Sequence, residues 1–150
     1  RRLGCHFIVA SGKTNLSRPL AIARGLGTPA FVIFDVDNGN QGDKNKRDNR
    51  CLFELCGMTD ADPLPNDIVW GQHLIAWPNT IKHSVSADVG EDKWNAADAE
   101  VRKKFDYEEL PQKNPLVIAG ILEELWSNGA KSDVLARACD LVLDFARKAP

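Results

Sequence analysis

The sequence predicts an α/β fold in which helices flank a largely parallel sheet and additional helices follow at the C-terminal end. Two apolar runs, residues 5–10 (CHFIVA) and 30–34 (AFVIF), are rich in branched and aromatic side chains, which is typical of buried parallel strands. A helical segment lies between them, and a strand–helix–strand unit favours parallel strands joined by a right-handed crossover. Apolar residues at helical spacing then dominate the second half of the chain. This order of patterns is typical of the α/β class.

The first helix is expected between the two apolar runs. Asn15 and Ser17 are candidate N-terminal caps, and Pro19 suits a first helical turn. Gly25 and Gly27 are stop signals, because glycine adopts a positive φ at little cost where a helix ends.

Turn signals and apolar spacing predict the remaining elements. A helix that ends at Gly57 precedes two short strands around Gly71, and three further helices follow, the last of them starting at Ser132 or Asp133. The apolar stripes of these four helices are, in chain order, Leu52, Phe53, Leu55 and Cys56; Trp94, Ala97, Val101 and Phe105; Ile118, Leu122 and Leu125; and Val134, Ala138, Leu141 and Phe145.

The composition indicates a globular chain of one domain's size. Of its 150 residues, 43% are hydrophobic and 27% are charged, and 19 basic against 21 acidic side chains give a net charge of −2. This balance argues against an extended basic arm, although a local basic patch can still bind a polyanion. The longest apolar stretch, residues 115–122, is much shorter than the roughly 20 residues that span a bilayer, so no membrane association is expected.

The cysteines and the chain start give two further expectations. None of the cysteines shows the paired spacing of a zinc site, so we expect reduced, buried thiols in a cytoplasmic protein. The cysteines are Cys5, Cys51, Cys56 and Cys139. The chain opens on Arg1 and enters a strand-like run almost at once, so we interpret it as a piece of a longer protein. Residues 1–110 are expected to form the α/β core, and residues 111–150 a helical part packed on the same domain.

The most informative residues are two aspartates after the second apolar run, Asp35 and Asp37. Side chains two positions apart on a strand point to the same face, so both carboxylates are expected on one side. In an open parallel sheet, ligands bind beyond the carboxyl ends of the strands. Two adjacent carboxylates repel each other, and a hard cation such as Mg²⁺, which binds carboxylate and phosphate oxygens, relieves that repulsion. The pair therefore predicts a metal site, whereas Asp37-Asn38-Gly39 alone would indicate only a turn.

Several basic residues are candidates to hold a nucleic-acid backbone. Those in the mixed-charge segment 38–50 form either a solvated helix start or a basic rim beside the metal. A lysine in the Ser-Gly-Lys-Thr segment after the first run offers a point charge to a phosphate. That segment is not a Walker loop, because Phe7 stands where such a loop needs glycine. The candidates are Lys13, Lys44, Lys46, Arg47 and Arg50.

Two known families place an aspartate pair after such a strand. The run VIFDVDNGN resembles the signature of haloacid-dehalogenase-like phosphatases, with Asn40 where that family has threonine. This resemblance implies Asp35 as a nucleophile and Asp37 as an acid/base. The phosphatase signature normally lies on the first strand and continues with an apolar residue, whereas here it lies on the second expected strand and runs into a polar loop.

A longer part of the chain resembles the TOPRIM nuclease domain of the OLD (overcoming lysogenization defect) family. The run IVASGKTNLSRPLAIARGLGTPAFVIFDVDN has that family's features in order: a Gly-Lys segment after a strand, a helix, a Leu-Gly-Thr-Pro corner and the aspartate pair. Lys113, before a long helix, resembles the family's downstream lysine region. The resemblance is good over residues 7–58 and weaker beyond, and it implies a TOPRIM, Rossmann-like sheet.

The OLD-family resemblance implies a metal-dependent DNA endonuclease. Asp35 and Asp37 would hold Mg²⁺ or Mn²⁺ in a two-ion arrangement, in which one ion activates water and the other stabilises the leaving oxygen. Lys113 would offset charge on the scissile phosphate, so the implied catalytic residues are Asp35, Asp37 and Lys113. The implied partners are DNA and an ABC-type ATPase domain of the same chain, and whether the protein forms a homodimer is left open. The implied setting is phage defence or DNA processing in a bacterium.

One TOPRIM feature is missing from the sequence. TOPRIM domains carry a glutamate in a Val-Glu-Gly-like segment, and we expect this glutamate and its strand to lie upstream of the given residues. Where ligands of a second metal are expected, the chain has Thr80, Ile81 and Lys82, with the acidic residues Asp88, Glu91 and Asp92 a little later. These departures leave a third interpretation open, a degenerate TOPRIM module that binds nucleic acid or a partner without cleaving.

Overall fold

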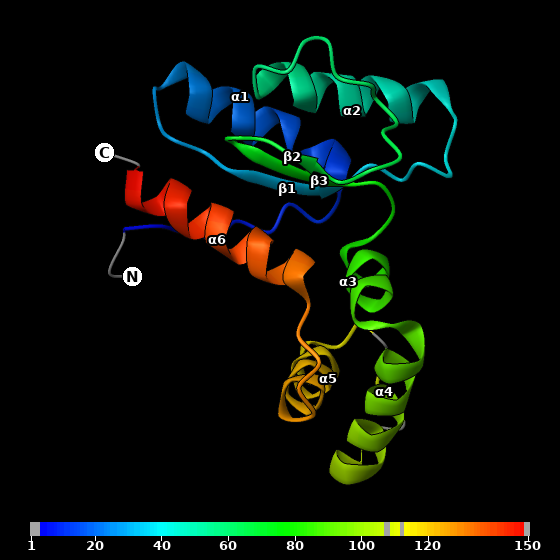
Figure 1. Cartoon of the computed structure of the whole chain (residues 1–150). Coiled ribbons are helices and arrows are strands. Elements are labelled where there is room, and N and C mark those ends of the chain that lie inside the picture. The colour runs from blue at the N-terminus through cyan, green and yellow to red at the C-terminus, as the bar shows by residue number, and fades with distance from the viewer. Residues whose placement is uncertain (1–3, 107–108, 112, 149–150) are drawn as a thin grey trace. The chain divides into compact units, whose positions relative to one another are not determined.

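Three short strands and six α-helices form the regular structure of the computed structural model, which describes residues 4–106, 109–111 and 113–148 (Figure 1). The strands are β1 (Val32–Asp35), β2 (Val69–Trp70) and β3 (Leu74–Trp77). The helices are α1 (Ser17–Gly25), α2 (Asp43–Leu55), α3 (Ile81–Val89), α4 (Glu91–Phe105), α5 (Pro115–Ser127) and α6 (Asp133–Lys148), and a one-turn 3-10 helix, η1 (Lys13–Asn15), precedes α1. The mixed α/β class predicted from the sequence is confirmed.

The strands form one sheet in the order β1–β3–β2. β1 runs parallel to β3, with Asp35 opposite Trp77, and β2 pairs antiparallel with β3. The two strands expected around Gly71 are therefore present, and Gly71 N donates to Leu74 O at 2.9 Å in the turn between them. Among the described strands, one pairing is parallel and one is antiparallel, so the sheet is mixed rather than largely parallel.

The chain divides into two compact units. We call Arg1–Ile81 together with Arg137–Pro150 the sheet unit, and Lys82–Ala136 the helical unit. The sheet unit contains the strands, α1, α2 and most of α6, and the helical unit contains most of α3 together with α4 and α5. The domain boundary expected between residues 110 and 111 falls between α4 and α5, inside the helical unit.

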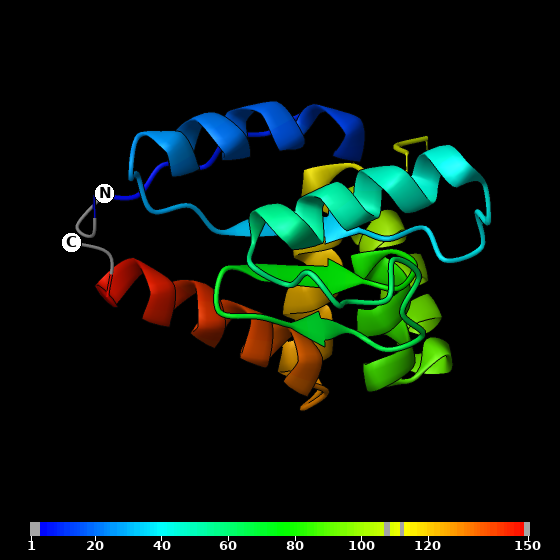
Figure 2. The ribbon, with the colours of Figure 1, turned by 90° about the horizontal axis from the view of Figure 1, so that it is seen from above.

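One face of the sheet is covered by α1 and α2, which lie side by side (Figure 2). Alternation along the strands turns every second side chain toward these helices. The rings of Phe34 on β1 and Phe53 on α2 meet edge to face, with 5.6 Å between their centroids. The buried residues of this core are Leu20, Val32, Phe34, Val36, Leu52, Phe53, Leu64, Leu74 and Ala76.

The opposite face of the sheet is covered by α6 (Figure 1). The ring of Phe145 on α6 lies 5.4 Å from that of Phe31 and 5.9 Å from that of His73, measured between centroids. Ile75 and Trp77, which alternate with the residues of the first core, are fully buried. α6 leaves part of this face open at β1, where the Ile33 side chain is 42% exposed.

Local signals in the sequence account for several helix ends. The chain leaves α2 through Gly57, whose φ of 82° needs a residue without Cβ, and α1 ends at Gly25 as predicted. α5 begins with Pro115 after the cap Asn114, whose Oδ1 accepts a hydrogen bond from Leu116 N at 2.9 Å. Among the described residues, no helix combines the length and the apolar character that crossing a membrane requires.

In the helical unit, α4 and α5 pack against each other at very short range. Trp94, Ala97 and Val101 on α4 are buried, as their spacing predicts, whereas Phe105 is 44% exposed. Gly120 on α5 is also buried, and a Cβ added there would lie only 2.6 Å from Cγ1 of Val101. The close approach of the two helices therefore depends on glycine at this position.

The strand expected at residues 5–10 is not formed, and this prediction was wrong. The segment is irregular, and the side chains of Phe7, Ile8 and Val9 are 88%, 78% and 89% exposed. Its residues have the composition of a strand, but a strand also needs a neighbouring segment to complete its ladder of hydrogen bonds. No described segment pairs with residues 5–10.

The expectation of buried cysteines is wrong for three of the four. Cys5, Cys51 and Cys139 are exposed, and Cys56 is half-buried. The thiols of Cys51, Cys56 and Cys139 are not in disulfides, as expected of reduced cysteines. Burial raises the pKa of the Cys56 thiol, and the charge of the Arg24 guanidinium opposes this rise more weakly.

Candidate metal site at the end of strand β1

The chain turns sharply just after β1, at the second aspartate. Val36 N donates to Trp77 O at 2.7 Å, so the backbone stays beside β3 to the end of the strand. Asp37 then adopts a φ of 56°, in the left-handed region, and Asn40 N donates to Asp37 O at 2.8 Å. Aspartate tolerates this conformation better than most residues do. The turn indicated by the Asp-Asn-Gly sequence is therefore present, and it sets the direction of the Asp37 carboxylate.

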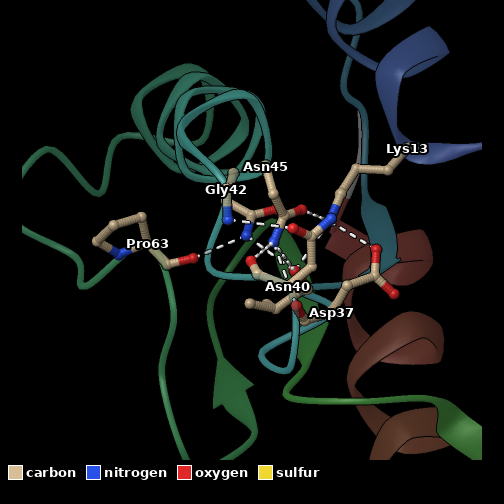
Figure 3. Close-up of polar contacts among 8 residues, drawn as sticks. Lys13, Asp37, Asn40, Gly42, Asn45 and Pro63 are labelled. Carbon is tan, nitrogen blue, oxygen red and sulfur yellow. Dashed lines mark hydrogen bonds and ion pairs between the residues drawn. The ribbon is translucent and has the colours of Figure 1, made fainter.

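Lys13 points at this turn from the segment before α1 (Figure 3). Its Nζ lies 2.9 Å from Asp37 Oδ2, 2.9 Å from Val36 O and 2.6 Å from Asn45 Oδ1. An ammonium group has three N–H donors, and each of them has an oxygen partner here. The Lys13 side chain is 11% exposed, whereas that of Asp37 is 53% exposed. The ammonium is thus shielded from water while the carboxylate stays accessible.

The backbone that delivers Lys13 depends on the glycine before it. Gly12 has a φ of 127° and a ψ of 150°, a combination that is essentially restricted to glycine. Directly after it the chain forms the single turn of η1, in which Lys13 is the first residue. The Gly-Lys segment thus orients a lysine side chain toward the aspartate turn.

Asn45 on α2 is buried against the same turn, and the sequence analysis did not single it out. Its Nδ2 donates to Asn40 O at 2.8 Å, to Val36 O at 3.1 Å and to Asp37 O at 3.2 Å. Its Oδ1 accepts from the Lys13 ammonium (Figure 3). One amide group therefore fixes both the backbone of the turn and the position of the lysine.

Asn49, one helical turn further along α2, is fully buried. Its Nδ2 donates to Val36 O at 2.9 Å and to Pro63 O at 2.8 Å. Positions 45, 49, 52 and 56 continue one stripe at helical spacing, so the two asparagines extend the apolar side of α2 toward its N-terminus. Because Asn45 and Asn49 share a helix face with buried apolar residues, the sequence could have predicted that both amides are buried.

The carbonyl of Val36 is the centre of these contacts. Lys13, Asn45 and Asn49 all donate to it, at distances between 2.9 and 3.1 Å. A buried carbonyl that has left the strand ladder needs other donors, and side chains from two elements supply them here. The segment that carries Asp37 is therefore tied to both η1 and α2.

Asp35 is the last residue of β1 and is half-buried. By alternation along the strand it shares the sheet face of Ile33, which is opposite the face that α1 and α2 cover; the Ile33 side chain is 42% exposed. The expectation that Asp35 and Asp37 point to the same side assumed that this alternation continues to Asp37. The strand geometry ends before Asp37, whose φ is positive, so the alternation does not determine where its carboxylate points.

The oxygens at this strand end suit a hard divalent cation. A carboxylate, backbone carbonyls and amide oxygens are the ligands that Mg²⁺ and similar cations take from proteins, with water completing the shell. Within the described ranges, no three His, Cys, Asp or Glu side chains gather closely enough to hold a metal by themselves. The candidate site therefore consists of the Asp37 carboxylate and neutral oxygens, and Asp35 lies two residues earlier, at the end of β1.

The basic residues expected as a nucleic-acid rim lie on the helix α2 itself. Lys44, Arg47 and Arg50 are exposed, and Lys46 is half-buried. At 100° per residue, Arg47 lies about half a turn and Arg50 about a third of a turn away from the buried side of α2, and both side chains are exposed. Binding of nucleic acid by these four residues stays a prediction.

Lys113 belongs to the helical unit, where it is exposed just before the cap of α5. Because the aspartates lie in the other unit, its approach to a phosphate held there stays a prediction. Asp88, also in the helical unit, has a structural role. Its Oδ2 accepts from Ser132 Oγ at 2.7 Å and from Val134 N at 3.1 Å, and so caps the start of α6.

No protein-family model, curated protein or solved structure matches the chain.

Proposed function

We propose that this chain is a TOPRIM-like nuclease domain that hydrolyses DNA phosphodiesters with Mg²⁺ or Mn²⁺ bound at the end of β1. The observation that carries the proposal is the position of Asp35 and Asp37 at the carboxyl end of a strand that runs parallel to its neighbour. Ligands bind beyond such strand ends in α/β sheets. The TOPRIM assignment, and with it an ABC-type ATPase domain in the same chain, rests on the resemblance of residues 7–58 to OLD-family nucleases.

In this proposal each side chain has a defined task. Asp35 and Asp37 supply the anionic oxygens of the metal site, and the bound metal would activate water and stabilise the leaving oxygen. Asn45 and Asn49 hold the backbone on either side of Asp37, so that its carboxylate keeps one orientation. Lys113 neutralises charge on the phosphate. The basic residues of α2 attract the nucleic-acid backbone.

The test is incubation of supercoiled plasmid with the full-length protein in Mg²⁺ and, separately, in Mn²⁺. The double variant Asp35→Ala, Asp37→Ala is compared with Asp60→Ala, Asp67→Ala, which removes two carboxylates that are exposed in the same unit. We expect nicked or linear product that requires the metal, persists in the control pair and disappears in the site pair. Cleavage that survives the loss of Asp35 and Asp37 would contradict the assignment, and turnover of a phosphate monoester alone would favour the phosphatase.

A second candidate function is a nucleic-acid-binding module that does not cleave. It is favoured by the occupation of Asp37 by the Lys13 ammonium, since a lysine can neutralise this aspartate permanently. The module would bind DNA in a gel-shift assay to the same extent with Mg²⁺ and with a chelator, and it would leave plasmid intact. The nuclease predicts metal-dependent product under the same conditions.

A further inference from the structure

We propose that Lys13 is a tethered cation that competes with a divalent metal for the Asp37 carboxylate. In the absence of metal the ammonium occupies the site, and it gives up Asp37 Oδ2 when a divalent cation binds there. The inference rests on the metal site of the proposed function and adds how occupancy of that site is controlled.

The Lys13 ammonium is surrounded by three oxygens. Its three neighbours are a carboxylate oxygen of Asp37, the backbone carbonyl of Val36 and the side-chain carbonyl of Asn45, at 2.6–2.9 Å. These are the three kinds of oxygen that hard divalent cations take from proteins. The nitrogen of Lys13 therefore lies among the ligands that a metal at Asp37 would use.

The oxygens just beyond the end of β1 favour a positive charge nearby. The carbonyls of Val36, Asp37 and Asn40 converge on the side-chain amide of Asn45. The carbonyl of Val36 also shares the Lys13 ammonium with the Asp37 carboxylate. A carboxylate among carbonyl oxygens is stabilised by a nearby positive charge. Lys13 supplies that charge from 24 residues earlier in the chain, with its side chain only 11% exposed. Its burial costs solvation, which is recovered only while all three donors are bonded.

The element that carries Lys13 is weakly packed. η1 is a single turn that contributes no buried side chain, and the segment before it is irregular and exposed. Withdrawal of Lys13 therefore disturbs little packing. Asn45, in contrast, is held by α2 and by three carbonyls, so the remaining oxygens of the site stay in place when the ammonium leaves.

Competition by a tethered group reduces the apparent affinity for the metal to the intrinsic affinity multiplied by the fraction of molecules in which the site is open. After its release from Asp37, the Lys13 side chain stays close to the site, because its backbone position is unchanged. Its positive charge could then contact a phosphate of the proposed DNA substrate. The same side chain would thus serve as a counter-ion before the metal binds and as a phosphate ligand afterwards.

The first experiment measures Mn²⁺ binding to the whole chain by electron paramagnetic resonance, with Lys13→Met beside the control Arg18→Met. Arg18 is exposed on α1, so the control removes one positive charge without touching the site. We expect Lys13→Met to bind Mn²⁺ at least about tenfold more tightly than the wild type, and the control to change much less. Equal or weaker binding by a folded Lys13→Met chain would overturn the inference.

The second experiment uses the unmodified protein, so it does not depend on whether a variant folds. Acetylation of lysines by an amine-reactive ester is followed by peptide mapping, with and without Mg²⁺. We expect Mg²⁺ to increase the labelling rate of Lys13 several-fold and to leave the exposed Lys93 unchanged. A labelling rate at Lys13 that Mg²⁺ does not change, at concentrations where Mn²⁺ binding saturates, would show that the ammonium stays on Asp37.

The two proposals fail in different ways. If wild type and Lys13→Met bind Mn²⁺ equally, and Asp37→Asn binds less, the metal site stands and only the competition is overturned. If neither chain binds Mn²⁺ while circular dichroism shows both folded, the metal site itself is overturned and the inference with it.

Discussion

Replacing Asn49 by aspartate is the sharpest test of how the strand end is held. The substitution keeps the size and shape of the side chain but exchanges its two N–H donors for an acceptor oxygen. The contacts with Val36 O at 2.9 Å and Pro63 O at 2.8 Å then become oxygen–oxygen contacts at a fully buried position. No other substitution in α2 changes so few atoms at so buried a site.

The expected loss of stability follows from these two contacts. Val36 O keeps Lys13 and Asn45 as donors, so the loss there is one hydrogen bond, about 1 kcal/mol. Pro63 O loses the donor that Asn49 supplies, which costs about 1–3 kcal/mol. The new carboxylate adds the penalty of a buried, poorly compensated charge. The free energy of unfolding should therefore fall by at least about 3 kcal/mol at neutral pH.

The assay is urea denaturation followed by circular dichroism, with hydrogen exchange to locate the change. The matched control is Asn95→Asp, which makes the same substitution at an exposed position of α4. We expect faster exchange in α2 of the Asn49 variant and a control within about 0.5 kcal/mol of the wild type. A loss of less than about 1 kcal/mol at Asn49 would refute the claim that this amide holds the end of β1 to α2.

Three further predictions address packing, backbone and reactivity. In Gly120→Ala the added methyl group meets Val101, which should lower the free energy of unfolding by about 1–3 kcal/mol. The higher helix propensity of alanine offsets about 1 kcal/mol of this loss. In a denaturation series, the double variant Gly120→Ala, Val101→Ala should recover part of the loss. Gly12→Ala should cost about 1–3 kcal/mol through the backbone alone, because space is open around a Cβ there; thermal unfolding indistinguishable from the wild type would contradict this. Since burial raises the pKa of the Cys56 thiol, a smaller fraction of it is thiolate at pH 8 than for a thiol with the ordinary pKa. Mass spectrometry should therefore find Cys56 alkylated more slowly than the exposed Cys139, and the rate at Cys56 should increase as the pH rises. Equal alkylation rates at the two cysteines would contradict this.

The helices were the part of the fold that the sequence predicted best, because their signals are local. The stripe of Leu52 and Phe53 predicted the buried side of α2, and both residues are fully buried. The stripe of Trp94, Ala97 and Val101 did the same for α4. Each pattern repeats within one element, and its meaning does not depend on residues elsewhere in the chain.

The strand at residues 5–10 was mispredicted because a strand depends on its neighbours. Its apolar residues meet the compositional criterion as well as those of β1 do, but β1 has β3 beside it. The candidate site shows the same division. Asp35 and Asp37 were found from a local pattern, whereas the contact of Lys13 with Asp37 joins residues 24 positions apart and depends on how α1 and α2 pack.

Asn45 and Asn49 lie between these cases. Their spacing is local and places them on the buried side of α2, but their residue type is ordinary on a solvated helix start. The charged residues between them favoured the solvated interpretation. What explains the two buried amides is the carbonyl of Val36, which lies just beyond the end of β1 and accepts hydrogen bonds from both of them.

Lys13 affects the stability of this strand end and its proposed affinity for metal in opposite directions. The Lys13 ammonium satisfies three oxygens and neutralises Asp37, so it stabilises the fold when no metal is bound. If it also competes with the metal, then Lys13→Met should unfold at lower temperature in a chelator and gain more in melting temperature from Mg²⁺ than the wild type does. A lysine that only stabilises the fold would give the first effect without the second. The difference between the two melting shifts therefore distinguishes a structural ion pair from a site that a metal can take over.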